Sequence, residues 1–216
     1  MTLVKWIVCQ VPPELRNGFD EAQQQWQRLA TAAGFLGQIG GWDQNDSTQG
    51  CILALWQDWA AYDQFMAQLH DEIVGQSDQQ RTYTAIHVAR AEVLFPMPGA
   101  ASNVGAALAA ARVLRVADCR VHNAQVDHFV TVQQQVWLPA MAASNGMLSG
   151  CFSQCTKEAD HYLVTTLWDT MANHGDYSAH QVPTLRAQAN VTSDLAALIG
   201  YVVALEPQWS VLPDRR

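Results

Sequence analysis

The stretch Phe19–Gln25, FDEAQQQ, recurs as FVTVQQQ over residues 129–135. The two copies share the pattern F-x-x-[A/V]-Q-Q-Q and lie 110 positions apart in a chain of 216 residues. Solenoid repeats recur every few tens of residues, whereas a period of this length is the size of a domain. The sequence therefore predicts two copies of one unit. Any surface that one copy uses for pairing would then be paired within the same molecule.

The correspondence continues on both sides of this motif. Cys9 corresponds to Cys119 at the same shift, and a slip of two residues between Gln25 and Gly34 fits an insertion at the end of a helix. After the slip, Gly34-Phe35-Leu36 corresponds to Gly146-Met147-Leu148, and Leu55-Trp56 corresponds to Leu167-Trp168. The matched positions are mostly apolar or small, and the glutamines are the only polar matches. This pattern indicates that a core was copied rather than a set of catalytic residues.

Length, composition and charge exclude several classes of protein. The chain suits two domains of about 100 residues each. Hydrophobic residues make up 49% of the chain and charged residues 15%, which indicates a globular protein with a substantial core. The formal net charge of -8 and the lack of a basic run argue against a nucleic-acid partner. No apolar run approaches the roughly 18 residues that cross a bilayer, so no membrane partner is expected.

The N-terminus and the cysteines predict a cytoplasmic protein. Residues 1–5 begin at once with strand-like sequence and lack the charged leader and apolar core of a secretory signal. Five cysteines, an odd number, indicate reduced thiols. Cys151 and Cys155 are four residues apart without matching partners elsewhere, so we expect buried packing rather than metal binding.

Hydrophobic periodicity divides each copy into the order strand, helix, strand, strand, helix, strand. In the first copy, strands are predicted over 3–11, 35–42, 51–56 and 83–94, with helices over 13–34 and 59–69. In the second copy, strands are predicted over 114–121, 146–154, 162–168 and 198–205, with helices over 126–142 and 169–188. Pro183 should interrupt the last helix. The expected domains are residues 1–95 and 112–207, with a linker over 96–111 and a tail over 208–216.

This order predicts an α+β fold in which each copy has a four-stranded antiparallel sheet with both helices on one face. Both faces of the strands are apolar, because Val4 and Trp6 point opposite to Ile7 and Cys9. The helices pack on one face of each sheet, and the other face requires a partner sheet. We expect the second copy to supply that sheet.

Three motifs resemble the dimeric α/β-barrel superfamily, which contains the antibiotic-biosynthesis monooxygenase-like proteins. They are Lys5-Trp6-Ile7-x-Cys9, Gln25-Trp26, and G-F-L-G-Q-x-G-G-W over residues 34–42. Within the superfamily, the pattern is similar to a bacterial family of unknown function. The resemblance covers the first 95 residues well and the second copy more weakly. It implies two ferredoxin-like (β-α-β-β-α-β) repeats that form an intramolecular dimeric α/β-barrel, as a monomeric pseudo-dimer or as part of a further homodimer.

The superfamily includes cofactor-free oxygenases of activated phenols, haem-degrading oxygenases, chlorite dismutase-like proteins, lactone isomerases and stress proteins. Its pocket usually lies between the sheet and the helices of each unit. Haem-degrading members have an Asn on the first strand, a Trp on the second helix and a His ten residues later. This chain has Cys9-Gln10, Phe65 and Gly75 there, and Tyr177 near the Trp position of the second copy. The haem-degrading pattern is therefore absent, and we expect no cofactor.

Three histidines are the candidate catalytic residues: His70, His87 and His174. The densest polar cluster is His70-Asp71-Glu72, and a histidine beside carboxylates can act as a general base. Consecutive helix residues point in different directions, however, so an exposed helix end is the alternative. His87 either faces a cavity or packs in the core. The histidines are not copied between the repeats, and no spacing of metal ligands occurs, so no metal site is predicted.

The tryptophans and the repeated glutamines are the candidate ligand-binding residues. Trp56 and Trp168 end equivalent strands, where they either line an aromatic cavity or fill the core between sheet and helices. Gln25 and Gln135 would then offer directional hydrogen bonds to the ligand.

These residues predict a protein that binds a small apolar or aromatic molecule. One hypothesis is a cofactor-independent monooxygenase, in which the carbanion of the substrate itself reduces oxygen and the protein supplies a dry pocket. The alternative is a non-catalytic stress or ligand-sequestering module. Copied catalytic residues would favour two active sites, and the histidines do not meet that condition.

Overall fold

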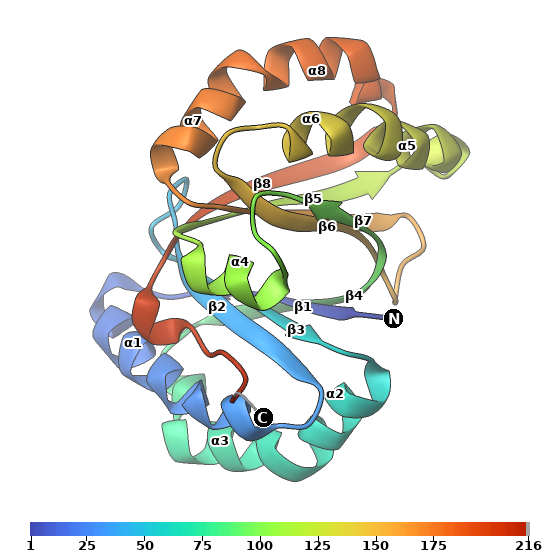
Figure 1. Ribbon diagram of the computed structural model, residues 1–216. Coiled ribbons are helices and arrows are strands. Elements are labelled where there is room, and N and C mark those ends of the chain that lie inside the picture. Colours follow the sequence, from blue (N-terminus) through green and yellow to red (C-terminus); the bar gives the residue numbers. More distant parts are fainter. Residues whose placement is uncertain (215–216) are drawn as a thin grey trace. The chain divides into compact units, whose positions relative to one another are not determined.

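The computed structural model describes residues 1–214, which form two compact units (Figure 1). Unit 1 comprises Met1–Arg90 and the C-terminal segment from Val203, and unit 2 comprises Ala91–Val202. Each unit contains strands with helices packed along one face of its sheet (Figure 1). The α+β class and the two ferredoxin-like repeats predicted from the sequence are confirmed.

Unit 1 is built around β3, which pairs antiparallel with both β1 and β2. Its strands and α-helices are β1 (Leu3–Gln10), α1 (Arg16–Gln24), β2 (Phe35–Asp43), β3 (Gln49–Trp56), α2 (Trp59–Phe65), α3 (Asp71–Ser77) and the first residues of β4 (Ala85–Pro98). Short turns of 3-10 or π-helix are Pro13–Leu15, Gln25–Thr31, Met66–His70, Gln79–Arg81 and Pro207–Trp209. Asp58 begins α2 by accepting a 2.9 Å hydrogen bond from the Ala61 backbone N–H, as an N-cap residue does.

Unit 2 repeats this arrangement around β7, which pairs antiparallel with β5 and β6. Its elements are α4 (Val104–Ala110), β5 (Val113–Val121), α5 (Val126–Val132), α6 (Leu138–Ala142), β6 (Met147–Cys155), β7 (His161–Trp168), α7 (Met171–His180), α8 (Val182–Ala189) and most of β8 (Leu195–Leu205). A π-helical turn over Gln133–Trp137 joins α5 to α6, and 3-10 turns span Asn123–Gln125 and Val191–Ser193. Pro183 lies in the first turn of α8, so the predicted interruption is confirmed.

The last strand of each sequence repeat contributes to the sheet of the other unit. Residues 91–98 of β4 pair with β6 within unit 2, whereas residues 203–205 of β8 pair with β2 within unit 1. Consequently, the compact units do not coincide with the sequence repeats. The strand predicted over 83–94 extends through Pro96 and Pro98, because proline is compatible with a strand where its missing N–H is not needed. The rest of the segment expected as a linker contains α4.

The repeated glycines have a conformational reason. Gly34 and Gly146 have φ angles of 70° and 78°, in the left-handed region that favours glycine, and each precedes a corresponding strand. Both faces of the sheets are buried, as the apolar pattern indicates: Val4, Trp6, Leu114 and Val116 are fully buried on one face. Among residues 1–214, no helix is long and apolar enough to cross a membrane.

Candidate functional site

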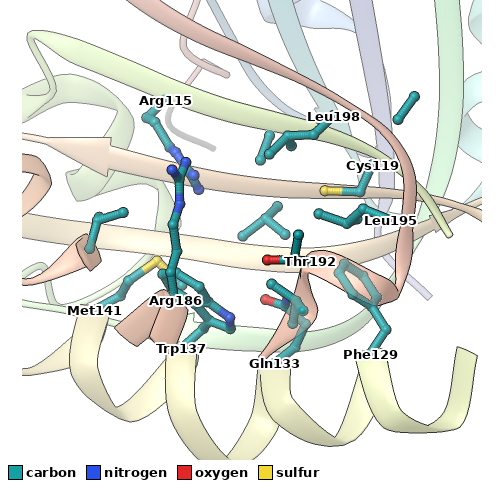
Figure 2. Close-up of a pocket in the computed structure, with 15 residues that line it drawn as sticks. Arg115, Cys119, Phe129, Gln133, Trp137, Met141, Arg186, Thr192, Leu195 and Leu198 are labelled. Atoms are coloured by element: carbon teal, nitrogen blue, oxygen red, sulfur yellow. The ribbon is translucent and has the colours of Figure 1, made fainter. Parts of the chain in front are cut away.

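A cavity of about 360 Å³ lies within unit 2, between its sheet and its helices (Figure 2). The sheet wall comes from β5, β7 and β8, and the opposite wall comes from α5, the π-turn, α6 and α8. Alternation along β5 directs Arg115, Ala117 and Cys119 toward the helices. Ala117 leaves space in the middle of this wall, since its side chain is a single methyl group. The cavity thus occupies the place between sheet and helices where the resemblance implies a pocket.

The helical wall of the cavity has an unusual turn. Phe129, Gln133, Trp137 and Met141 line the cavity at a spacing of four residues. Residues Gln133–Trp137 form a π-helix, whereas Gln25–Thr31 of unit 1 form a 3-10 helix. A π-turn accommodates one extra residue within a helix. This insertion explains why Trp137 lies 111 positions after Trp26, and not 110, in the repeat.

Two polar groups of this wall have no protein partner. The side chain of Gln133 is 5% exposed and forms no hydrogen bond with any residue in 1–214. The indole N–H of Trp137 is also buried without an acceptor in the described part of the chain. Leaving a buried donor unpaired costs about 1–3 kcal/mol, so such groups are usually satisfied. Of the two, the Gln133 amide is suited to bond a ligand in the cavity, because the Trp137 indole nitrogen is itself closed off from the cavity space.

Arg115 perturbs the titratable groups around it. Burial raises the pKa of the Cys119 thiol to about 12, and the positive charge of Arg115 opposes that shift only partly. Burial, followed by the charge of Arg115, lowers the pKa of His174. Burial raises the pKa of Tyr177, again opposed by Arg115. At neutral pH, Cys119, His174 and Tyr177 are accordingly uncharged.

The predicted tryptophans lie in the core, outside the set of residues that lines this cavity. Trp168 is fully buried, donates a 2.9 Å hydrogen bond to Thr166 Oγ1, and has its ring centre 5.0 Å from that of Tyr177. Trp56 is 1% exposed and stacks on Phe65 at 4.8 Å. Of the two alternatives drawn from the sequence, the structure places both indoles in the packing between sheet and helices.

The predicted glutamines point to solvent. Gln25 and Gln135 are exposed, whereas Gln23 and Gln133 are buried. The inward residue is the first glutamine of each triplet, because it lies four residues after Phe19 or Phe129 and shares the face of that aromatic side chain. This spacing was the signal in the sequence that would have selected Gln133.

The three candidate histidines are not brought together. His70 lies in unit 1, with Nδ1 2.8 Å from Oδ1 of Asp71, whose side chain is 96% exposed. His87 lies on β4 and is exposed. His174 of unit 2 is buried on α7, with its ring 5.5 Å from that of Trp168. The residues that line the cavity include no histidine. Within residues 1–214, no group of three His, Cys, Asp or Glu side chains is placed to hold a metal ion.

Sequence comparison missed a charged match between the repeats. Lys5 and Arg115 are 110 positions apart, so both copies carry a cation at this position of the first strand. Lys5 is 8% exposed, and its Nζ lies 5.5 Å from the centre of the Tyr62 ring. The view that the glutamines were the only polar matches was therefore wrong. That view considered only identical residues, whereas Lys5 and Arg115 differ in identity and share a positive charge.

Solved structures with this fold span nearly the whole chain. A candidate monooxygenase of Fusobacterium nucleatum aligns with a TM-score of 0.77 and 11% identity, over 94% of this chain and 92% of that chain. An anthrone oxidase-like protein aligns with a TM-score of 0.74 and 13% identity, over 99% of this chain and 94% of that chain. These similarities show that the chain shares its fold with both proteins.

Sequence similarity identifies the family. Residues 3–90 match the family described as Domain of unknown function (DUF4937). The uncharacterized protein YdbC of Bacillus subtilis (strain 168) is 34% identical over 88 residues, which are 40% of this chain and 74% of YdbC. The chain therefore belongs to the same bacterial family as YdbC, in agreement with the resemblance seen in the sequence.

Proposed function

We propose that unit 2 binds a small, largely apolar or aromatic molecule in the cavity between its sheet and its helices. The observation that carries this proposal is the cavity itself, at about 360 Å³, with aliphatic side chains on both walls and Phe129 and Trp137 on the helical wall. Ligand sites commonly have this size and combine an apolar lining with a few polar groups that orient the ligand. The Gln133 amide is such a group.

The chemistry that we propose for this site is cofactor-independent oxygenation. A CH2 group activated by a neighbouring carbonyl or aromatic ring loses a proton to water, and its carbanion supplies the electrons that reduce O2. One oxygen atom stays on the carbon as C=O, and the other leaves as water. The similarity in fold to a candidate monooxygenase and to an anthrone oxidase-like protein supports this class of reaction. The five free cysteines support a reducing, cytoplasmic location.

A non-catalytic, ligand-sequestering role is the second candidate. One observation favours it: the residues that line the cavity include no Asp, Glu or His, so none of them is an ordinary general base. The Cys119 thiol, with its pKa of about 12, is not a base at neutral pH. An enzyme of this design requires a substrate that ionises readily by itself.

A matched pair of variants on β8 tests the site. Ala197 lines the cavity, and Ala196, its neighbour on the same strand, is not among the residues that line it. Both residues are exposed, so a large side chain is tolerated at either position. We expect A197W to abolish binding of anthrone, measured by fluorescence titration, and A196W to retain it. Equal binding by the two variants would contradict the proposed location.

The same pair separates the two candidate functions. For an oxygenase, the unsubstituted protein and A196W should show anthrone-dependent O2 uptake with one O2 consumed for each anthrone oxidised, and A197W should not. Binding without O2 uptake would support the sequestering module instead.

A further inference from the structure

Two arginines meet at one end of the cavity. Arg115 extends from β5 on the sheet wall, and Arg186 extends from α8 on the opposite wall. Figure 2 shows the two guanidinium groups pointing toward each other, on the same side of the cavity as Met141 and Trp137. Like charges in such proximity repel, so the arrangement is more stable with an anion between them.

The described part of the chain, residues 1–214, provides no such anion. Within residues 1–214, neither guanidinium group forms an ion pair or a hydrogen bond with another residue, and the cavity lining contains no Asp or Glu. The closest carboxylates along the chain already have partners: Oδ1 of Asp118 lies 2.7 Å from Nε2 of His161, and Oδ2 of Asp194 lies 2.7 Å from Nδ1 of His128. Arg115 is partly buried, and charged groups in that setting are usually paired. Two unpaired arginines stand out in a chain with 20 acidic and 12 basic residues.

The neighbouring titratable groups do not supply the negative charge either. Cys119, His174 and Tyr177 are all uncharged at neutral pH, for the reasons given above. The positive charge at this end of the cavity is therefore uncompensated. Arginine is the side chain best suited to a planar oxyanion, because its N–H groups match the two oxygens of a carboxylate.

We propose that the ligand of this cavity is an amphiphilic anion, with an apolar or aromatic body and one oxyanion bound between Arg115 and Arg186. The body would lie against Phe129, Ala117 and Leu195, and Gln133 would bond to a polar atom along it. The oxyanion is a carboxylate or an ionised phenol or enol, since all present the same charged oxygen. This inference rests on the proposed function, because the arginines line the same cavity.

Naphthalene derivatives of one size test the proposal. The probes are 2-naphthoate, which is anionic at pH 7, and 2-naphthalenemethanol, which is neutral, each titrated by its fluorescence. We expect 2-naphthoate to bind at least about tenfold more tightly, as for hydrogen bonds to a charged group. R186Q and R115Q should each weaken naphthoate binding by about tenfold and leave binding of the alcohol within about twofold. Arg186 is exposed, so R186Q should fold even if R115Q does not.

The control is R81Q, because Arg81 has an 83% exposed side chain and lies in unit 1. It removes the same charge and should change neither affinity. A third probe, 2-naphthol, distinguishes the source of the oxyanion: a fall of its pKa on binding indicates a phenolate, while tight naphthoate binding indicates a carboxylate. Either result supports the proposal.

Two outcomes would overturn it, and they differ. If the alcohol binds as tightly as naphthoate, naphthol shows no fall in pKa and R186Q has no effect, the anion is refuted while the proposed apolar site stands. If none of the three probes binds the unsubstituted protein, the proposed binding function fails together with the anion.

Discussion

Lys5 offers a direct test of the electrostatics of unit 1. Burial, followed by repulsion from Arg90, lowers the pKa of Lys5 from 10.5 to about 8. One pKa unit corresponds to about 1.4 kcal/mol, so holding the charged form costs the folded state about 3 kcal/mol below pH 8. K5M keeps most of the side-chain volume and removes the charge. We expect this variant to be more stable than the unsubstituted protein at pH 7, by up to about 3 kcal/mol. The gain is an upper limit, because the variant also loses the contact of the ammonium with Tyr62.

The pH dependence distinguishes this explanation from simple improved packing. The folded pKa of Lys5 lies below the unfolded value, so the unfolded chain binds more protons between pH 8 and 10.5, and the contribution of Lys5 to stability rises with pH across this window. The advantage of K5M should therefore shrink toward zero by pH 10.5. Buried thiols such as Cys9, whose pKa burial raises to about 12, act in the opposite direction in this range. Only the difference between the two proteins isolates Lys5.

The assay is urea unfolding followed by tryptophan fluorescence at pH 7, 8, 9 and 10, with a reducing agent present. A stability difference that is constant with pH would refute the reasoning. So would a K5M protein that is less stable at pH 7, because it would mean that the ammonium makes a favourable interaction stronger than its cost of burial.

Three further predictions concern other parts of the chain. W209A should destabilise unit 1 by about 3–5 kcal/mol in urea unfolding, because Trp209 is fully buried. L212A, at a side chain that is 39% exposed, should cost under about 1 kcal/mol. Equal losses in the two variants would contradict this packing. Q133L should weaken binding of 6-hydroxy-2-naphthoate, which has a second polar atom along its body, and leave binding of 2-naphthoate unchanged in fluorescence titrations. Q135L should alter neither, and a matching effect of Q135L would place the ligand elsewhere. Cys119 should resist alkylation by iodoacetamide at pH 8 in the folded protein and react in urea, because burial raises its pKa to about 12. Mass spectrometry of the peptide that contains Cys119 measures the labelling, and rapid labelling without urea would refute that burial.

The sequence was sufficient for the fold but not for the exchange of strands. The repeated F-x-x-[A/V]-Q-Q-Q and the apolar periodicity predicted two β-α-β-β-α-β units, because both depend on local pattern. The pairing of residues 91–98 with β6 and of 203–205 with β2 joins segments that are far apart in the chain. A strand pattern specifies which face is buried and not which neighbour it pairs with. Pro96 and Pro98 favoured the prediction of a linker from residue 96, whereas β4 continues through Pro98.

The candidate site was harder to predict, for two physical reasons. Three consecutive glutamines are equivalent in composition, and only the register of the helix relative to Phe129 places Gln133 inside and Gln135 outside. The π-turn that carries Gln133 and Trp137 depends on one inserted residue, which the sequence showed only as a slip. Arg186 has no equivalent cation in the first copy, so the repeat could not point to it; residues 74 and 76, at shifts of 112 and 110, are Val and Gln.

The two copies differ at the place where unit 2 has its cavity. Cys119 and Phe129 belong to the buried core cluster of unit 2 and also line its cavity, whereas the cluster of unit 1 that holds their counterparts Cys9 and Phe19 contains Trp209. The ring of Trp209 lies 5.4 Å from that of Phe19, and its N–H donates a 2.6 Å hydrogen bond to Asp20. The C-terminal segment thus packs the large indole of Trp209 against Phe19 in unit 1, whereas the counterpart Phe129 lines the cavity in unit 2.

The sheet wall of the cavity also differs between the two copies, with a larger side chain in unit 1. Ala117, the small residue in the middle of the sheet wall of unit 2, is replaced by Ile7 at the equivalent position, and Ile7 packs against the cluster that holds Trp209. Isoleucine adds three carbon atoms where alanine leaves space. Duplication preserved the scaffold and one cation on the first strand, and the differences at these positions favour filling in unit 1 and opening in unit 2. For this reason we locate the ligand of the proposed function in the second copy, where Arg186 and the π-turn also occur, although the family match covers the first.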